Sequence, residues 1–315
     1  MSKRLADLQA GDHLEMPVLI EQMDVRKAKN GKQFLALTFA DASGKIAGKY
    51  WQASDLDAKT FVAGQIVLLN GQCETYNNAL QVKIDHLKLA PPNTYTLDQF
   101  VQHAPLTKQQ LQDQMNELVL EITQPHWNRI VRYLINQHHE GFFEFPAAKK
   151  NHHDYTGGLA FHTLSIAKLA NAVCDQYSQV NRALLIAGTI LHDLGKTTEL
   201  SGPVNTQYTV EGNLLGHLVI MDGEIVAACQ QLKLDSNAED VVLLRHMIIA
   251  HHGLLEYGSA KRPQLLEAEI LHDLDELDAT ITMITKAQAK AQPGQFSERV
   301  FGLDNRRFYV PANLD

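Results

Sequence analysis

Leu191-His192-Asp193-Leu194-Gly195-Lys196 follows directly on an apolar helical run, Ala183 to Leu191, and stops it with a glycine. Burying an imidazole beside a carboxylate at a helix end costs free energy unless something binds both groups. A divalent metal ion would do so, because neutral imidazole and carboxylate are suitable metal ligands. The stretch therefore predicts a metal site at the end of a buried helix.

Further histidines and aspartates recur on other predicted helices. They lie near helix ends or on apolar helices: His162, His217, His251, His252, Asp275 and Asp278. Asp275 and Asp278 are three residues apart, so they share one helical face, whereas Asp273 lies off that spacing. A lone His-Asp pair is usually a surface contact or a satisfied core histidine. Ligands that converge from separate elements instead indicate a metal centre, and the pattern predicts a metal-dependent hydrolase.

Length and composition indicate an ordinary globular protein with room for two domains. The chain has 315 residues, of which 45% are hydrophobic and 20% charged. Its cysteines, Cys73, Cys174 and Cys229, are far apart and lack CxxC spacing, which indicates a reducing compartment. The N-terminus has no apolar signal region, and no stretch is apolar enough to span a membrane. We therefore expect a cytoplasmic protein with no membrane partner.

The net charge of −8 is unevenly distributed. Residues 1–90 hold 11 Lys or Arg and 10 Asp or Glu, whereas the rest of the chain holds 17 and 26. An acidic balance is expected in a region that holds cations. Because the local field sets phosphate binding, the first region can still carry a basic patch for nucleic acid.

Residues 12–90 predict short strands separated by turns. Asn30-Gly31, Asp41 to Gly44 and Asn77-Asn78 are the turn signals. The predicted strands are Met16–Gln22, Phe34–Phe39, Lys45–Trp51, Ile66–Leu69 and Leu80–Ile84. Five strands at this spacing suit a small closed barrel, and their order resembles OB-folds that bind single-stranded nucleic acid. We expect an all-β OB-fold domain over residues 1–90.

After Pro91-Pro92-Asn93, which marks a linker over residues 91–105, the pattern is helical. The predicted helices are Leu106–Ile122, Pro125–His138, Gly158–Tyr177, Ala183–Leu194, Leu214–Leu232, Ala238–Ala250 and Gln264–Lys290. Gly141–Thr156 and Ser201–Gly212 are predicted loops. We expect an all-α bundle over residues 106–291 that brings the ligands together in its core. The extension over residues 292–315 has mixed charge and no assigned structure.

Several phrases of the helical region carry a family resemblance. They are Gly157-Gly158-Leu159-x-x-His162-Thr163-Leu164, His192-Asp193-Leu194-Gly195-Lys196, Leu214-Leu215-Gly216-His217, His251-His252-Gly253 and Asp275-x-x-Asp278-Ala279. These phrases resemble the HD superfamily of metal-dependent phosphohydrolases. From about Gly11 to Lys290, the whole chain looks like the YhaM-type 3′-5′ exoribonucleases, which join an N-terminal OB-fold to an HD domain.

The resemblance implies a phosphodiesterase that releases nucleoside 5′-monophosphates from the 3′ end of single-stranded RNA or DNA. It implies a divalent metal, commonly manganese, with Fe, Co, Ni or Mg as alternatives, and the number of histidines favours two ions over one. Metal ions would lower the pKa of bound water and neutralise charge on the phosphoryl oxygens. By this analogy Asp193 bridges two metals. His162, His192 and Asp275 would complete one metal, and His217, His251 and His252 the other.

Three further positions near the predicted site have alternative interpretations. Lys196 would contact a phosphate in catalysis, or its charge would complement a helix dipole. Asp278 would orient a histidine rather than bind metal. The segment that leads to His162, with Lys149, Lys150, His152 and His153, would line the RNA path or form a solvated loop.

The barrel offers aromatic and basic side chains to a single strand. The stacking candidates are Phe34, Tyr50, Trp51 and Tyr76, and the phosphate-binding candidates are Arg26, Lys27, Lys29, Lys32 and Lys49. The alternative is structural, since Phe34 would be half core by alternation and strand lysines often protect edges.

Three functions follow from these observations. The first is a 3′-end exonuclease whose barrel feeds single strands to the metal site. The second is a mononucleotide or cyclic-nucleotide phosphohydrolase with a regulatory or oligomerising barrel. The third is a non-enzymatic nucleic-acid-binding factor. The full set of ligands favours an enzyme, and the barrel favours the exonuclease, because a small nucleotide needs no strand-tracking groove. A homo-oligomer is compatible with each of them.

Overall fold

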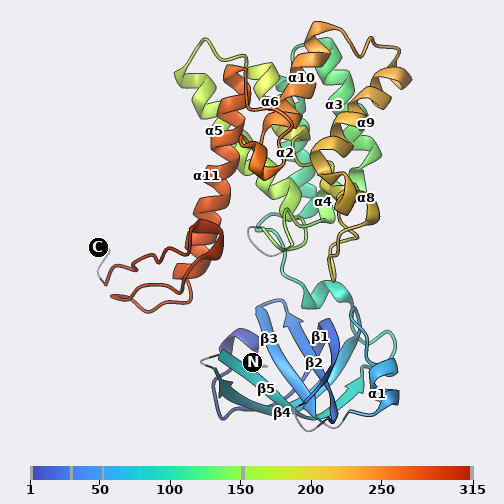
Figure 1. Cartoon of the computed structure of the whole chain (residues 1–315), viewed down its shortest axis with the longest axis vertical. Helices are drawn as coiled ribbons and strands as arrows, with labels where there is room; N and C mark the ends of the chain where they lie inside the picture. Colours follow the sequence, from blue (N-terminus) through green and yellow to red (C-terminus); the bar gives the residue numbers. More distant parts are fainter. Residues whose placement is uncertain (1–2, 29–30, 52, 78, 150–152, 313–315) are drawn as a thin grey trace. The chain divides into compact units, whose positions relative to one another are not determined.

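The computed structural model of the chain describes residues 3–28, 31–51, 53–77, 79–149 and 153–312. It divides into two compact units, Met1–His103 and Ala104–Asp315 (Figure 1). Each unit has its own cluster of buried hydrophobic side chains. The barrel unit extends past residue 90, because the segment predicted as a linker contains the 3-10 helix η2 (Leu97–Phe100), whose Phe100 is buried.

The first unit is a closed five-stranded barrel. Its strands are β1 (His13–Lys27), β2 (Gln33–Asp41), β3 (Gly44–Trp51), β4 (Ile66–Tyr76) and β5 (Ala79–Leu89), with a short helix α1 (Asp55–Thr60) between β3 and β4. The strand order is β1-β2-β3-β5-β4, and only the β3–β5 pair is parallel. Closure of five strands in this order is the OB-fold, as the sequence predicts.

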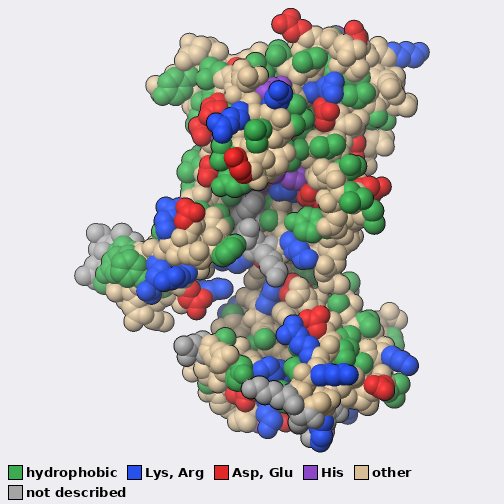
Figure 2. Space-filling view, in the orientation of Figure 1, with side chains coloured by type: hydrophobic (Ala, Val, Ile, Leu, Met, Phe, Trp, Pro, Cys, Tyr) green, Lys and Arg blue, Asp and Glu red, His purple; other side chains and the backbone are tan. Residues whose placement is uncertain are grey.

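Alternation along the strands fills the barrel. Val18, Leu35 and Phe39 are fully buried on β1 and β2, and Val67 and Val82 meet them from β4 and β5. Side chains at every second position point inward. Leu19, which lies between two of them on β1, is buried as well. On the visible face of this unit, Lys and Arg side chains are prominent (Figure 2).

The second unit is a bundle of helices. The longer ones are α2 (Lys108–Glu121), α3 (Pro125–Gln137), α5 (Gly158–Gln176), α6 (Arg182–Leu191), α9 (Gly216–Leu232), α10 (Glu239–Ala250) and α11 (Leu266–Gln288). Short helices α4 (His139–Glu144), α7 (Lys196–Glu199) and α8 (Val210–Leu214) lie between them. Every residue of α6 from Ala183 to Leu191 is buried, so this helix forms the centre of the bundle.

Some predicted boundaries differ from the structure. Part of the predicted loop Gly141–Thr156 is helical, because Phe142 and Phe143 of α4 are buried in the bundle core and fix that turn despite its glycine. The helix predicted over Ala183–Leu194 ends at Leu191. The helix predicted from Leu214 starts at Gly216, after the separate helix α8.

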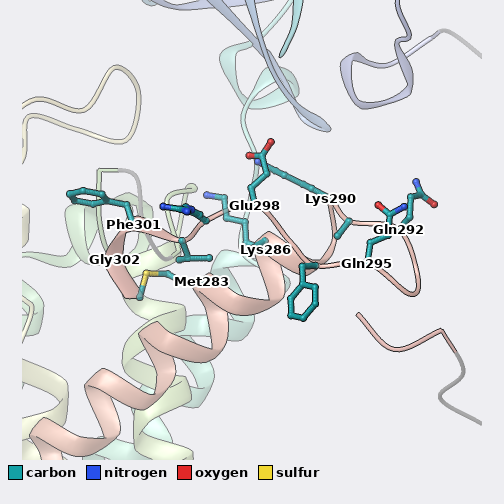
Figure 3. A pocket seen from close by; sticks show the side chains of 13 residues that line it. Met283, Lys286, Lys290, Gln292, Gln295, Glu298, Phe301 and Gly302 are labelled. Carbon is teal, nitrogen blue, oxygen red and sulfur yellow. The ribbon is translucent and has the colours of Figure 1, made fainter. Parts of the chain in front are cut away.

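Residues 292–312, here called the C-terminal arm, form an irregular hairpin after α11. Antiparallel bridges join Phe296 to Tyr309 and Val300 to Arg306, and Gln288 Nε2 donates to Tyr309 O at 2.9 Å. The end of α11 and the arm enclose a cavity of about 520 Å³ (Figure 3). The extension left unassigned by sequence is therefore ordered over most of its length.

Within the described part of the chain, no helix is both long enough and apolar enough to cross a lipid bilayer.

Candidate metal centre and nucleic-acid interface

Two buried helices are each followed by a histidine whose ring donates a hydrogen bond to a carbonyl of the same helix. His192 follows α6 and donates from Nδ1 to Thr189 O at 2.7 Å, and His251 follows α10 and donates from Nδ1 to Ile248 O at 2.7 Å. Each ring therefore donates to a main-chain carbonyl in the last turn of its own helix. This bond also fixes the tautomer, so that Nε2 of each ring is the available acceptor.

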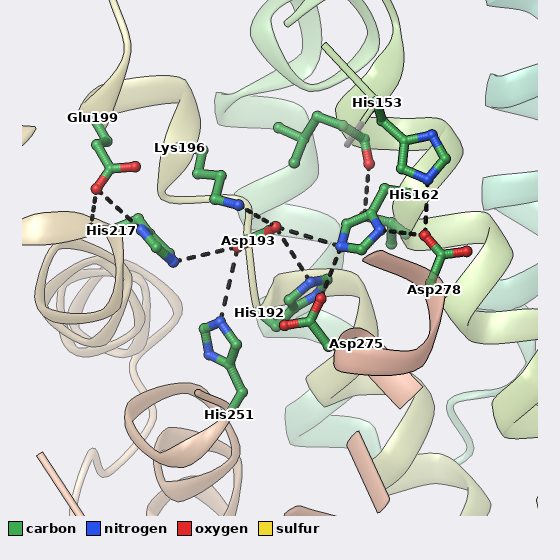
Figure 4. Close-up of polar contacts among 12 residues, drawn as sticks. His153, His162, His192, Asp193, Lys196, Glu199, His217, His251, Asp275 and Asp278 are labelled. Carbon is green, nitrogen blue, oxygen red and sulfur yellow. Dashed lines mark hydrogen bonds and ion pairs between the residues drawn. The ribbon is translucent and has the colours of Figure 1, made fainter. Parts of the chain in front are cut away.

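Asp193 lies at the centre of the cluster and is 2% exposed (Figure 4). Its Oδ1 is 3.3 Å from His217 Nε2 and 3.8 Å from His251 Nε2. Its Oδ2 is 3.4 Å from His192 Nε2, 3.7 Å from His162 Nε2 and 2.7 Å from Lys196 Nζ. The two carboxylate oxygens therefore face two different groups of imidazoles.

On one side of Asp193, α5 and α11 hold His162 between two carboxylates. Asp275 Oδ1 is 3.0 Å from His162 Nε2, and Asp278 Oδ2 accepts from His162 Nδ1 at 2.7 Å. Asp278 also accepts from Ser165 and, at 2.8 Å, from His153 Nε2. Through its bond to Nδ1, the Asp278 carboxylate is placed to orient the His162 imidazole.

Glycines bring the loop of His153 onto the start of α5. Gly157 has a φ of 76°, and a Cβ on Gly158 would lie 2.0 Å from His153 O. Only glycine fits such an approach. His153 is thus buried at Asp278. It is therefore neither part of a solvated loop nor part of an RNA path, the two roles predicted for its segment.

On the other side of Asp193, α7 holds His217. Glu199 Oε1 accepts from His217 Nδ1 at 3.0 Å and from His217 N at 3.1 Å. A Cβ on Gly195 would lie 2.5 Å from His217 O, so the glycine after the His-Asp pair lets the two segments touch. His252 lies beside His251, with ring centroids 4.4 Å apart, and donates from Nδ1 to Tyr257 O at 2.7 Å.

The chemistry of these groups fits a metal. Among the described residues, Nε2 of His192, His217 and His251 and Oδ1 of Asp193 are buried without a hydrogen-bond partner. Buried polar atoms left without partners cost free energy, which a bound cation would offset. Donor atoms of His162, His192 and Asp193 lie within 4.8 Å of one another, and so do those of His217, His251 and His252.

Burial and charge shift the pKa values of these groups in opposite directions. Burial would raise the pKa of Asp193, but Lys196 and His192 outweigh it and hold that pKa well below its ordinary value. Burial would lower the pKa of Lys196, yet Asp193 keeps it raised. Burial together with His252 and His192 lowers the pKa of His251 well below its ordinary value. Asp193 is therefore ionised and His251 neutral at neutral pH, the forms in which they bind metal.

A cavity of about 520 Å³ reaches the cluster from the surface. Lys196, His217 and His252 line it together with Lys149 and Tyr208. Lys149 Nζ donates to Gln207 Oε1 at 2.9 Å. The structure thus brings Lys149 to the same cavity as the metal-ligand candidates, while Lys150 and His152 lie outside the described residues.

In the barrel unit, three of the four predicted stacking residues gather on one surface. The rings of Phe34 and Trp51 are 4.7 Å apart, and Lys49 Nζ lies 3.9 Å from the ring centroid of Tyr76. Trp51 is 43% exposed and Tyr76 54%. Tyr50 is the exception, because its ring packs against Phe61 and the barrel core, on the opposite side of β3 from Trp51. This placement contradicts a stacking role for Tyr50.

Three of the five predicted phosphate-binding residues flank the turn after β1, whereas Lys49 lies on β3 beside Tyr76. Arg26, Lys27 and Lys32 are exposed, and Arg26 pairs with Asp24 at 2.9 Å. Lys29 lies outside the described residues. The loops between β1 and β2 and between β4 and β5 are where OB-folds generally bind oligonucleotides.

Sequence reasoning missed Glu199 as the partner of His217 and the contact of His153 with Asp278. Glu199 follows Lys196 by three residues, a spacing that places it on the same short helix face. That spacing could have indicated that Glu199 lies near the metal-ligand candidates. The contact of His153 with Asp278 spans 125 residues, and no local pattern indicates it.

The chain is similar to several known proteins. The HD domain family model matches residues 159–280. The chain is 43% identical over 313 residues to "3′-5′ exoribonuclease YhaM" of Listeria welshimeri, covering 99% of both chains. The barrel resembles a domain of replication protein A from Methanococcus maripaludis (17% identity, 28% of this chain and 94% of that one, TM-score 0.25). It also resembles part of a replication protein A heterotrimer bound to single-stranded DNA (20% identity, 28% and 63%, TM-score 0.22).

Proposed function

This chain belongs to the YhaM family of 3′-5′ exoribonucleases, and we propose that the buried cluster around Asp193 binds the divalent metal with which it hydrolyses RNA. The observation that carries the proposal is the set of buried donor atoms that lack partners among the described residues and that converge on one carboxylate from α6, α9 and α10.

The ligand set supports two metal positions. His162, His192 and Asp275 would complete one position, and His217, His251 and His252 the other. Asp193 would contribute to both, because its Oδ1 and Oδ2 face different histidines. Manganese is the proposed ion, with Fe, Co, Ni or Mg as alternatives, because carboxylate ligands suit manganese and imidazole ligands also suit iron and nickel.

A divalent metal bound by these residues would lower the pKa of water and neutralise charge on the phosphoryl oxygens. Asp278 holds His162 and Glu199 holds His217, which fixes the orientation of both imidazoles. Lys196 holds Asp193 in its ionised form and lines the cavity, from which its ammonium group would meet a substrate phosphate. Asp193 and Lys196 are thus the proposed catalytic pair.

The barrel would hold the strand on which the bundle acts. Phe34, Trp51 and Tyr76 offer ring faces for stacking, and Lys49 lies among them. The exposed cations Arg26, Lys27 and Lys32, with Lys29, would bind phosphates at the neighbouring turn. At the bundle, Lys149 lines the cavity and would meet the strand there; Lys150, outside the described residues, remains a proposed contact.

An intracellular location accords with this substrate. Cys73, Cys174 and Cys229 are free and buried. Free thiols persist where the cellular redox poise is reducing. We propose that the protein acts in the cytoplasm.

Two differently labelled RNAs test the proposal. With manganese, an RNA labelled at its 5′ end should give a descending ladder of labelled products, whereas the same RNA labelled at its 3′ end should release labelled mononucleotide at once. Chelation should stop both reactions. A label lost first from the 5′ end, or hydrolysis confined to free nucleotides, would support a different reaction at this site.

A further inference from the structure

The end of α11 and the C-terminal arm together have the composition of a nucleic-acid-binding surface in an otherwise acidic chain. Residues 286–312, which span both, contain five Lys or Arg and two Asp or Glu, whereas the whole chain has a net charge of −8. On the visible face of the arm, basic and hydrophobic side chains lie next to one another (Figure 2). Local positive charge of this kind attracts phosphates whatever the total charge.

The cations at the cavity beside the arm are available to a ligand. Lys290 and Arg299 line this cavity (Figure 3), and among the described residues neither side chain has an acidic partner. Arg306 and Arg307 are used differently, because they donate to Leu303 O at 3.1 Å and Ser297 O at 2.9 Å and so hold the hairpin together. Arg306 and Arg307 thus stabilise the hairpin, whereas Lys290 and Arg299 remain available to a ligand.

Aromatic rings accompany these cations. Phe301 is 87% exposed and Phe296 is 55% exposed, and both line the same cavity. The Arg307 guanidinium lies 5.7 Å from the ring centroid of Phe296, and the Tyr309 ring lies 5.2 Å from it. Leaving two phenylalanine rings in water is unfavourable unless a partner covers them. Bases stack on such rings, while neighbouring cations bind the backbone phosphates.

We propose that the C-terminal arm and the end of α11 bind single-stranded RNA, as a contact surface separate from the barrel. The proposal rests on the exoribonuclease function, since it concerns the same substrate. Lys290 and Arg299 would each contact a phosphate, and Phe301 would stack on a base. Charge favours RNA as the occupant over another protein surface, because Lys286, Lys290 and Arg299 line the cavity against the single carboxylate of Glu298, whereas the chain as a whole is acidic.

Helix α11 links this surface to the metal centre. Asp275 and Asp278 lie at the site, and Gln288, the last residue of α11, follows Asp278 by ten residues, a distance of about 15 Å along the helix. Lys290 lies in the turn that follows. Lys286, one turn before Lys290, pairs at 2.7 Å with Asp154, the neighbour of His153. The arm therefore follows directly on the helix that supplies two carboxylates to the cluster. Several nucleotides would cover the distance between the arm and the cluster.

Binding by the full-length chain without metal tests this inference. The probe is a 5′-fluorescein oligouridine of about 20 nucleotides, compared with one of about 4, titrated in EDTA at several salt concentrations. Lys290→Ala/Arg299→Ala should reduce the slope of log affinity against log salt by about 1 to 1.5, because each phosphate contact to a single strand contributes roughly 0.7. Phe301→Ala should weaken the long probe by about tenfold and leave the short probe unchanged.

The matched control is Lys261→Ala/Arg262→Ala, which removes two exposed cations from the loop before α11. An unchanged slope in Lys290→Ala/Arg299→Ala, or an equal loss in the control, would overturn the inference. It would also be overturned if the arm variants change the oligomeric state and leave RNA affinity unaltered, because the surface would then join copies of this chain. Manganese-dependent cleavage by the wild-type chain is measured separately, so the exonuclease function and this inference fail independently.

Discussion

Asp278 accepts a hydrogen bond from His162 Nδ1 at 2.7 Å, although 116 residues separate them in the chain. The same carboxylate accepts from His153 and Ser165, so one side chain of α11 ties α5 and the preceding loop to the metal-ligand candidates. Burial would raise the pKa of Asp278, but its hydrogen bonds to His153 and His162 lower that pKa well below the ordinary value. It is therefore an ionised acceptor at neutral pH.

Replacing Asp278 by asparagine should weaken manganese binding about 10- to 100-fold, the usual effect of losing a carboxylate that orients a metal-bound histidine. Isothermal titration of the chelator-treated chain measures this directly. The control is Asp273→Asn, which changes an exposed carboxylate on the same helix. Equal metal affinity in the two variants would mean that Asp278 does not orient His162.

The metal-free chain should lose stability as the pH rises. Burial would lower the pKa of His162, but hydrogen bonds to Asp275 and Asp278 raise it to about 9. A pKa raised on folding contributes stability that is fully present below the unfolded value of about 6.5 and is lost as the pH passes through about 9. Urea unfolding should show a loss of roughly 3 kcal/mol across this window. Asp278→Asn should reduce the pH dependence, and an identical profile in both proteins would exclude His162 as its source.

His192→Ala and Asp193→Ala should each abolish RNA hydrolysis while single-strand affinity stays within about twofold, since binding is assigned to surfaces outside the cluster. Gel assays with saturating manganese and fluorescence anisotropy measure the two properties. His86→Ala, which removes an exposed histidine of β5, is the control for a lost imidazole. Turnover near that of the wild type in either site variant would show that the metal lies elsewhere.

Trp51→Ala and Tyr76→Ala should each weaken binding of a long single strand by about 1–3 kcal/mol, the contribution of stacking one base on an aromatic ring. Leu56→Ala is the control, because it removes an exposed hydrophobic side chain of the barrel unit that lies on α1 rather than on a strand. Tyr50→Ala should instead lower the barrel's stability, because its ring packs on the core. A binding defect in Tyr50→Ala without loss of stability would reverse the assignment of these two faces.

The periodicity of apolar residues predicted where the strands and helices lie better than it predicted which side chains of a strand point inward. Hydrophobic alternation located all five strands, and the spacing of apolar residues located the long helices. Tyr50 and Trp51 are neighbours on β3, so they cannot face the same way, yet both carry rings suited to stacking. Which ring points inward depends on the pairing of β3 with β2, where Trp51 lies opposite Phe34.

The residues around the site were harder to predict because their contacts are non-local. The ligand candidates stand at helix ends and share a recognisable spacing. His153 has no helical period, and its position depends on the close approach of its carbonyl to Gly158. The hairpin of the C-terminal arm depends on isolated bridges such as Phe296 to Tyr309, which leave no alternating pattern to detect.

The histidines that end α6 and α10 have a consequence for how the site is loaded. Both rings are fixed by a bond to the carbonyl three residues earlier, before any ion is bound. Their side-chain entropy is therefore lost during folding rather than during coordination, and an incoming cation finds a preorganised cage. Ion exchange then requires little rearrangement of the chain, so the identity of the bound metal follows the supply in the cell as well as the geometry of the cage.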